Sequence, residues 1–162
     1  MYVCIGSCYS VEDHFQNRVY YLLDEALTWD EARARCSEDN DGYLAAVKNE
    51  AQFNFMLGMF EKYRAQGGHF VSAWLDGKYE PATAMWRCDA YVYGTKTRCQ
   101  ATMPWAFGEP NNLELDEHCI LLWWSMTDGV ANFVCDALLP AICATFRYSF
   151  LSQTGEVKKS TK

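Results

Sequence analysis

The stretch YYLLDEALTWDEARARC, Tyr20–Cys36, joins a predicted strand to a predicted helix. Its beginning belongs to a run of β-branched and aromatic residues, Val19–Leu23, a composition typical of strands. Thr28 then precedes Glu31 by three residues, the spacing of a capping box, in which each side chain accepts a hydrogen bond from the other's backbone N–H. Apolar residues follow at helical intervals, so a helix is predicted over Trp29–Asp39.

Working outward, a second helix follows the first. The turn Asn40–Gly42 ends the first helix, and Tyr43–Val47 is predicted as a short apolar strand. Asn49 has the side chain of an N-cap, which predicts a helix from Glu50 to about Gln66. The predicted apolar face of this helix consists of Phe53, Met56, Leu57 and Phe60.

The C-terminal half is predicted to be mostly strand and loop. Phe70–Leu75 is a strand candidate, and a long loop-rich stretch follows up to Pro110. Cys119–Met126 and Phe133–Phe146 then return to strand composition. Two helices followed by an antiparallel sheet predict an α+β fold. We expect an N-terminal extension over 1–18, one domain over 19–147 and a polar C-terminal tail over 148–162.

The acidic charge of the chain limits its expected partners. The 162 residues carry a formal net charge of -7, which argues against nucleic acid or an anionic membrane surface and favours cations. Half of the residues are hydrophobic, enough for one globular domain with its own core. The longest apolar run, Cys119–Met126, is too short for a bilayer, so no membrane span is expected.

The cysteines indicate an oxidising compartment. There are 8 of them, an even number without a C-x-x-C pair, which favours disulfide bonds and a secreted or extracellular location. Met1–Cys4 has neither the basic start nor the apolar core of a signal peptide, as expected for a mature segment given an initiator methionine. Spacing alone does not determine which cysteines pair.

The stretch FGEPNNLELDEHC, Phe107–Cys119, gathers side-chain oxygens just before a predicted strand. Glu109 and Asn111 flank a proline, and a second acidic pair, Asp116 and Glu117, stops short of the cysteine. Carboxylates and side-chain amides are the ligands that a hard cation such as calcium prefers. The same residue types are also ordinary in a polar surface turn, so the residues alone leave both interpretations open.

Four segments together resemble the C-type lectin-like domain family. They are YYLLDEALTWDEARARC, WAFGEPNN, the triplet Glu-His-Cys ending at Cys119, and FVCDALLPAICA, and the resemblance covers about Cys8 to Thr145. The spacing from Glu109 through Glu117 to Cys119 is similar to that of the mannose-type members. The resemblance implies a C-type lectin-like fold, in which two helices pack on antiparallel sheets beside a long loop region and disulfides staple the domain.

The resemblance also implies a disulfide pattern. Carried over, it pairs Cys36 with Cys143 and Cys119 with Cys135, and it makes Cys88 and Cys99 an added bridge inside the long loop-rich stretch. Cys4 and Cys8 remain for each other, or for a bond to another chain. Such a bond, or the C-terminal tail, would cluster copies of the chain, so a homo-oligomer is one expected arrangement.

The implied function is non-catalytic, calcium-dependent recognition of terminal glycans. The implied ligands of calcium and sugar are Glu109, Asn111, Glu117 and Asn132. In the family, the bond before the motif's proline is cis, and we expect the same at Pro110. The order Glu-Pro-Asn is the family's signature for mannose, fucose, glucose and N-acetylglucosamine, whose vicinal hydroxyls complete the coordination of the ion.

One segment departs from the family pattern. The family has Trp-Asn-Asp where this chain has Val130–Asn132, a loss of one side-chain ligand and one negative charge that lowers calcium affinity. Asp128 would compensate in part if the register shifted. One alternative is a protein-interaction module with a degenerate calcium site, which binds a protein ligand through Ala90–Gly94 and its residues Tyr91 and Tyr93. A second alternative is an ice-binding or mineral-binding variant of the fold.

The remaining polar and aromatic residues do not indicate an enzyme. His118 is expected on the opposite face of a strand from its neighbour Glu117, so the two do not form a zinc or catalytic pair. With His14 and His69 it forms no nucleophile and base signature. The pair Trp123-Trp124 is expected in the core, since apolar neighbours suggest that both faces are buried.

Overall fold

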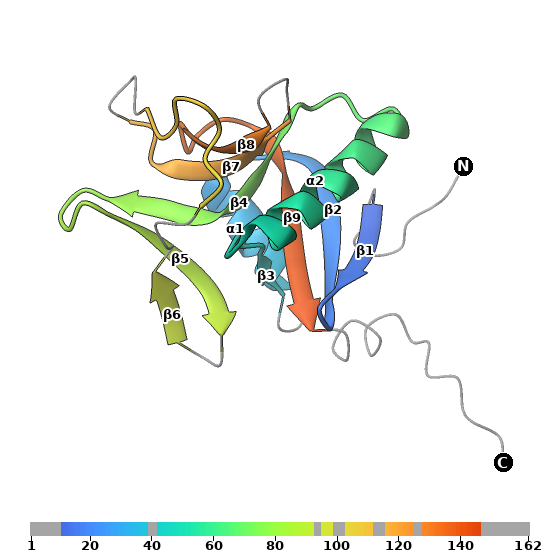
Figure 1. Cartoon of the computed structure of the whole chain (residues 1–162), viewed down its shortest axis with the longest axis horizontal. Helices are drawn as coiled ribbons and strands as arrows, with labels where there is room; N and C mark the ends of the chain where they lie inside the picture. The colour runs from blue at the N-terminus through green and yellow to red at the C-terminus, as the bar shows by residue number, and fades with distance from the viewer. Residues whose placement is uncertain are drawn as a thin grey trace, which may run out of the picture.

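The computed structural model of the chain describes residues 11–38, 42–92, 95–98, 103–111, 116–124 and 128–146. Two helices and nine strands lie in these ranges (Figure 1). In chain order they are β1 Val11–Phe15, β2 Arg18–Leu27, α1 Trp29–Glu38, β3 Tyr43–Leu44, α2 Glu50–Ala65, β4 Ser72–Glu80, β5 Met85–Val92, β6 Thr95–Arg98, β7 Cys119–Trp123, β8 Gly129–Phe133 and β9 Leu139–Phe146. The α+β class predicted from the sequence is confirmed.

The strands form one sheet with a branch. Its main order is β1-β2-β9-β4-β5-β6, with β3 beside β9, and with β7 joining β4 to β8. The pairings between these strands are antiparallel except for that of β4 with β9, which is parallel through Trp74 and Ala141. The sheet is therefore mixed rather than purely antiparallel. The branch through β7 and β8 carries the region where the sequence predicts a ligand site.

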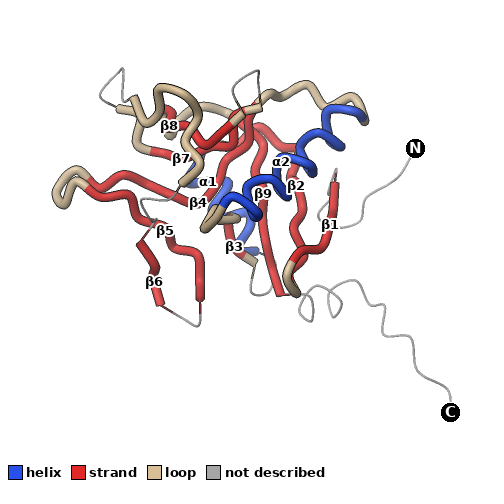
Figure 2. The backbone as a smooth tube through the Cα atoms, viewed as in Figure 1, coloured by secondary structure: helices blue, strands red, loops and turns tan. Residues whose placement is uncertain are grey.

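The helices cover opposite faces of this sheet, which explains the continuous apolar run in β2. Tyr20 and Leu22 pack in the same core cluster as the buried side chains of α2, whereas Tyr21 and Leu23 pack with those of α1. Figure 2 shows α2 crossing one side of the strands, with α1 on the other. A strand buried on both faces needs apolar residues at every position rather than at alternate ones.

Both helices begin at the predicted caps. Thr28 N donates to Glu31 Oε2 over 2.8 Å and Glu31 N donates to Thr28 Oγ1 over 3.3 Å, which completes the capping box of α1. Asn49 Oδ1 accepts from Gln52 N at 2.9 Å at the start of α2.

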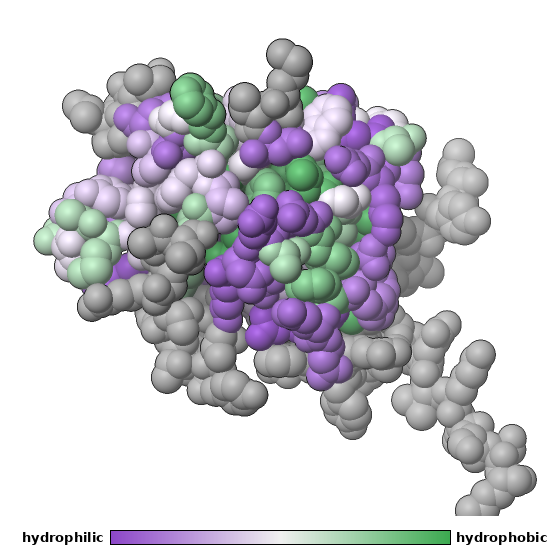
Figure 3. All heavy atoms as spheres, in the orientation of Figure 1, coloured by the Kyte–Doolittle hydropathy of each residue, from purple (hydrophilic) through white to green (hydrophobic). Residues whose placement is uncertain are grey.

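The apolar face of α2 differs slightly from the prediction. Leu57 is only partly buried, and Met59 and Tyr63 belong to the core beside Phe53, Met56 and Phe60. The exposed residues of this helix are mostly polar, and they form much of the hydrophilic surface in the middle of Figure 3.

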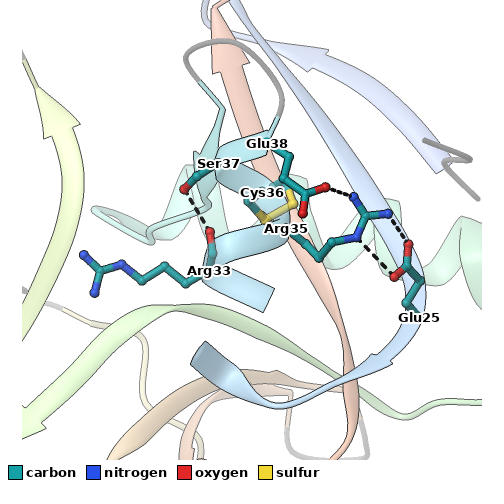
Figure 4. Close-up of polar contacts among 7 residues, drawn as sticks. Glu25, Arg33, Arg35, Cys36, Ser37 and Glu38 are labelled. Atoms are coloured by element: carbon teal, nitrogen blue, oxygen red, sulfur yellow. Dashed lines mark hydrogen bonds and ion pairs between the residues drawn. A yellow bond between two sulfur atoms is a disulfide. The ribbon is translucent and has the colours of Figure 1, made fainter. Parts of the chain in front are cut away.

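Helix α1 is attached to the sheet by an ion pair and a disulfide. Figure 4 shows Arg35 between Glu38 of the same helix and Glu25 of β2, whose Oε1 lies 2.7 Å from Arg35 Nη2. These side chains are partly exposed, so the pair adds little stability. The disulfide Cys36–Cys143 joins α1 to β9 across a sequence separation of 107. By closing so long a loop it is expected to stabilise the fold by roughly 4 to 5 kcal/mol.

The second disulfide, Cys119–Cys135, joins the start of β7 to the turn between β8 and β9. Both pairings are those that the family resemblance implies. Cys88 is disulfide-bonded as well, but its expected partner Cys99 lies outside the described residues, as do Cys4 and Cys8.

Three sequence predictions need correction. The stretch predicted as loop between Leu75 and Pro110 contains the end of β4 and the strands β5 and β6, which form an antiparallel meander. The predicted strand Phe133–Phe146 is in fact the last residue of β8, a turn around Cys135 and then β9. The segment Val130–Asn132, for which no strand is predicted from the sequence, lies inside β8.

No helix in the described part of the chain is long and apolar enough to cross a membrane.

Candidate functional site

The candidate site lies where the β6–β7 loop, described over 103–111 and 116–118, meets β8. Strand β8 pairs with β7 on one edge, and the loop follows its other edge. Val130 N donates to Pro104 O at 2.9 Å, and Ala106 N donates to Val130 O at 2.9 Å. These two bonds form a parallel bridge between Trp105 and Val130, so the loop has a fixed register against the strand.

Small and aromatic residues allow this close approach. A Cβ at Gly129 would lie 2.4 Å from the backbone nitrogen of Ala106, so only glycine leaves room for the loop there. On the other side, the Trp105 ring packs on that of Trp86 in β5, with centroids 5.5 Å apart. Packing and these hydrogen bonds thus hold Pro104–Ala106 between β8 and β5.

A tight turn then brings Glu109 and Asn111 together. Gly108 has φ 84°, a left-handed conformation that favours glycine, and Glu109 N donates to Ala106 O at 2.9 Å. The Glu109–Pro110 peptide bond is cis, as expected. Asn111 Nδ2 donates to Glu109 Oε1 at 2.6 Å, and Asn111 N donates to Glu109 Oε2 at 3.3 Å.

Asn132 connects this turn to the other predicted ligands. Its side chain is 3% exposed and Glu117 is 8% exposed. Asn132 Oδ1 accepts from Asn111 N at 3.1 Å, and Asn132 Nδ2 donates to the backbone oxygen of Glu117 at 3.0 Å. Asn132 N also lies 3.5 Å from Glu109 Oε2. The structure thus brings the four sequence-predicted site residues together.

These residues line one pocket of about 330 Å³, named here the loop–β8 pocket. Its lining is Ala106, Phe107, Glu109, Asn111, Glu117, Trp123, Ala131, Asn132 and Phe133. The carboxylates and amides form a polar wall, and three aromatic side chains form an apolar one. Such a combination suits a ligand that carries both hydroxyl groups and C–H surface.

The apolar wall differs from what the sequence predicts. Trp123 was expected to be core, yet it is only partly buried and it faces the pocket; Trp124 is also only partly buried. Trp123 is the last residue of β7, where its partner in β8 is Gly129, which has no side chain to cover the ring. Phe107 is 95% exposed, and sequence reasoning missed it together with Phe133. An aromatic residue next to a glycine turn in a polar loop was the available signal for Phe107.

The donor set fits a hard cation. Glu109 and Glu117 contribute two carboxylates and Asn111 an amide oxygen, all of them in the lining of one pocket. Among the described residues there is no group of three His, Cys, Asp or Glu side chains that could hold a metal ion, so calcium would depend on the amide as its third side-chain ligand. Ala131 offers no side-chain ligand, and Asn132 Oδ1 already accepts from Asn111 N.

The histidines lie apart from this pocket. The His118 ring packs near that of Tyr79, with centroids 5.7 Å apart. His14 lies 3.5 Å from Glu12, and the His69 ring packs on Phe70 at 4.4 Å. Of the alternative protein-binding segment, Ala90–Val92 falls within β5, whereas residues 93–94 lie outside the described residues.

Comparison with known proteins places most of the chain in one family. The profile of the Lectin C-type domain family matches residues 25–145. The hepatic lectin of Gallus gallus is 29% identical over 137 residues, which cover 79% of this chain and 58% of that protein. This chain therefore spans less than two thirds of the hepatic lectin. Lithostathine of Rattus norvegicus is 24% identical over 144 residues, which cover 85% of this chain and 78% of the relative.

Solved structures share the fold at low identity. Human lithostathine superposes with a TM-score of 0.68 at 19% identity, over 87% of this chain and 92% of that one. The C-type lectin CEL-I from Cucumaria echinata gives 0.64 at 17% identity, over 88% and 100%. A calcium-independent type II antifreeze protein gives 0.64 at 20% identity, over 89% and 95%. At such identities the likeness establishes the fold alone.

Proposed function

Since the chain belongs to the C-type lectin domain family, we propose that it is a carbohydrate-binding protein whose loop–β8 pocket binds a terminal sugar with the help of calcium. The observation that carries this proposal is the convergence of Glu109, Asn111, Glu117 and Asn132 on one pocket. The family is named for lectins, and the similar hepatic lectin is a binding protein by name, which argues against an enzyme.

The polar wall supplies complementary hydrogen-bonding groups. The Glu109 carboxylate accepts hydrogen bonds from sugar hydroxyls, and Asn111 Nδ2 donates to them. Binding a sugar here means exchanging the present contact of 2.6 Å between Asn111 Nδ2 and Glu109 Oε1 for contacts with the ligand. When bound, calcium would supply direct coordination of two neighbouring hydroxyl oxygens.

We propose mannose-type specificity, for mannose, fucose, glucose or N-acetylglucosamine. Its support is the order of the two residues around Pro110, because a carboxylate followed by an amide fixes which hydroxyl accepts and which donates. The affinity for a single sugar is expected to be millimolar, about -4 kcal/mol, because two hydroxyls at a surface ion bury little area. Clustered copies of the chain would then be needed for strong binding to glycans.

Calcium affinity is expected to be at the weak end of the extracellular range, about 10⁻³ M, because the described lining of the pocket has only two carboxylates and Ala131 adds no ligand. This proposal includes a secreted or extracellular location, which the disulfides support.

Binding of mannose-conjugated and galactose-conjugated albumin tests this function, in about 10 mM calcium and in chelator. We expect calcium-dependent binding of the mannose conjugate. Glu109→Gln combined with Asn111→Asp should shift the preference toward galactose. Glu61→Gln, an equivalent change on the exposed face of α2, is the matched control and should bind like wild type. Equal binding of both conjugates before and after the double change would refute the mechanism.

A second candidate is calcium-independent binding of a protein ligand. Two observations favour it: Phe107 is 95% exposed, and Ala131 stands in the pocket where the family has an amide ligand. Exposed aromatic side chains are typical anchors of protein interfaces. Failure to bind any glycan conjugate in calcium, with the protein folded, would make this candidate the better one.

A further inference from the structure

We propose that the side-chain amide of Asn132 orders the turn around Glu109 and Asn111, so that this turn is already formed without a metal ion. Asn132 is thus a positioning residue. This inference does not require that the loop–β8 pocket bind a glycan.

The amide of Asn132 joins two segments that no regular structure joins. Its Oδ1 accepts from the backbone N–H of Asn111 at 3.1 Å, and its Nδ2 donates to the backbone oxygen of Glu117 at 3.0 Å. Asn111, in the middle of the β6–β7 loop, and Glu117, two positions before β7, are therefore attached to the same side chain. Since Asn132 is only 3% exposed, water does not readily replace these bonds, and losing them leaves buried polar groups unpaired.

An amide satisfies both partners at this position, whereas a carboxylate does not. Asn111 offers an N–H donor and Glu117 offers a carbonyl acceptor, so the side chain between them has to accept on one side and donate on the other. An aspartate has acceptors only. It would place a carboxylate oxygen against the Glu117 carbonyl oxygen at a distance near 3.0 Å, which is repulsive unless a cation lies between them.

The rest of the turn is fixed by the backbone. Ala106 and Pro104 are hydrogen-bonded to Val130, two residues before Asn132 on the same strand. Asn132 N additionally lies 3.5 Å from Glu109 Oε2. The loop is thus held to β8 on both sides of the turn at residues 107–110, and Glu109 and Asn111 keep their places by bonds within the chain.

The consequence is that folding of the loop and binding of a cation are separate events in this protein. A cation would add contacts to a ligand, but the order of the loop would not depend on it. In an otherwise similar site with aspartate at this position, the loop would be ordered only when the cation is present.

Amide hydrogen exchange of the full chain tests the proposal directly, because it reports local opening residue by residue. We expect the backbone amides of Asn111 and Ala106 to be protected in chelator, with rates that change less than about twofold when calcium is added. Phe53 N, inside the hydrogen-bonded first turn of α2, is the internal reference. Protection of Asn111 in calcium but not in chelator would overturn the proposal.

Three variants test whether the side-chain amide of Asn132, rather than a bound cation, holds the turn. Asn132→Ala should accelerate exchange at Asn111 by about tenfold or more with or without calcium, since a buried hydrogen bond is lost. Asn132→Asp should do so in chelator and should regain protection in calcium, a response that a merely structural residue would not show. Asn111→Ala removes a proposed ligand but keeps the backbone N–H that donates to Asn132 Oδ1. The amide of residue 111 should therefore stay protected from exchange.

Protection of Asn132→Asp in chelator equal to that of wild type would contradict the proposal. If a variant at residue 132 does not fold, the comparison of wild type with Asn111→Ala still decides it. Wild type that is protected at Asn111 yet binds no glycan conjugate would overturn the proposed function and support this inference.

Discussion

Phe107 illustrates how one residue extends the site beyond the polar motif. It is 95% exposed at the turn that carries Glu109, and it lines the loop–β8 pocket. Exposing an aromatic ring has no benefit for the fold, because burial of such a ring is the larger stabilising effect. We therefore propose that the ring contacts a ligand in the pocket, which the following variant tests.

Phe107→Ala should weaken binding of the mannose conjugate about threefold to tenfold, because the apolar face of a sugar loses one ring contact. The thermal midpoint should hardly change, since an exposed side chain contributes little to stability. Leu138→Ala, which also removes an exposed apolar side chain outside the pocket lining, is the control and should leave both quantities unchanged. If Phe107→Ala binds the mannose conjugate as tightly as wild type, the ring does not contact the ligand.

Gly129 is a residue at which any added side chain would clash with the loop beside β8. Gly129→Ala should lower the unfolding free energy by about 1 to 3 kcal/mol, because its Cβ would lie 2.4 Å from Ala106 N. Gly58→Ala in α2 should raise it by about 0.5 to 1 kcal/mol, because nothing lies within 4 Å of that added carbon. Urea unfolding measures both, and a loss at Gly58 as large as that at Gly129 would contradict the steric explanation.

At the scale of elements, the sequence predicts what depends on neighbouring residues. Both helix starts follow from single side chains, Thr28 with Glu31 and Asn49, whose bonds act within three residues. Strand β8 was not predicted because Asn132 interrupts its apolar pattern. Asn132 is buried where its side chain accepts a hydrogen bond from Asn111 N, 21 residues earlier in the chain. Pairings such as β5 with β6, and the position of Trp123 at the pocket, are set by the arrangement of the whole sheet.

Strand β3 gives a prediction about pH. Tyr43 is buried, and burial raises the pKa of its hydroxyl to about 12, whereas an exposed tyrosine titrates near about 10. Below about pH 10 the hydroxyl is protonated in the folded and the unfolded chain, so its titration does not change the stability. As pH rises through about 12, ionisation favours the unfolded chain, and the unfolding free energy falls by about 2 to 3 kcal/mol. Tyr43→Phe should remove this part of the alkaline decline in a urea-unfolding series.

The same variant should not be destabilised at pH 7. The hydroxyl of Tyr43 has no hydrogen-bond partner among the described residues, and removing an unsatisfied buried hydroxyl is neutral or stabilising by up to about 1 kcal/mol. A clear loss of stability at pH 7 would indicate that the hydroxyl has a partner after all.

At the scale of the whole molecule, one of the two described disulfides joins distant parts of the fold, and the other lies near the candidate site. Cys36–Cys143 connects elements separated by 107 residues, whereas Cys119–Cys135 closes a separation of 16 within the branch that carries the pocket. The pairings themselves came from family resemblance, because no local property of a cysteine reveals its partner. On the chain-entropy model the longer loop restricts the unfolded chain more strongly.

Cys36→Ala with Cys143→Ala should therefore reduce the unfolding free energy by roughly 4 to 5 kcal/mol, close to the whole stability of a small domain, and Cys119→Ala with Cys135→Ala by about 3 kcal/mol. The second pair should affect binding more than its stability loss suggests, since Cys119 follows Glu117 by only two residues at the start of β7. Urea unfolding without reductant gives the two free energies, and binding of the mannose conjugate gives the second effect. A reversed order of stabilities would mean that native packing around the sulfurs, rather than the entropy of the unfolded chain, determines what each disulfide contributes.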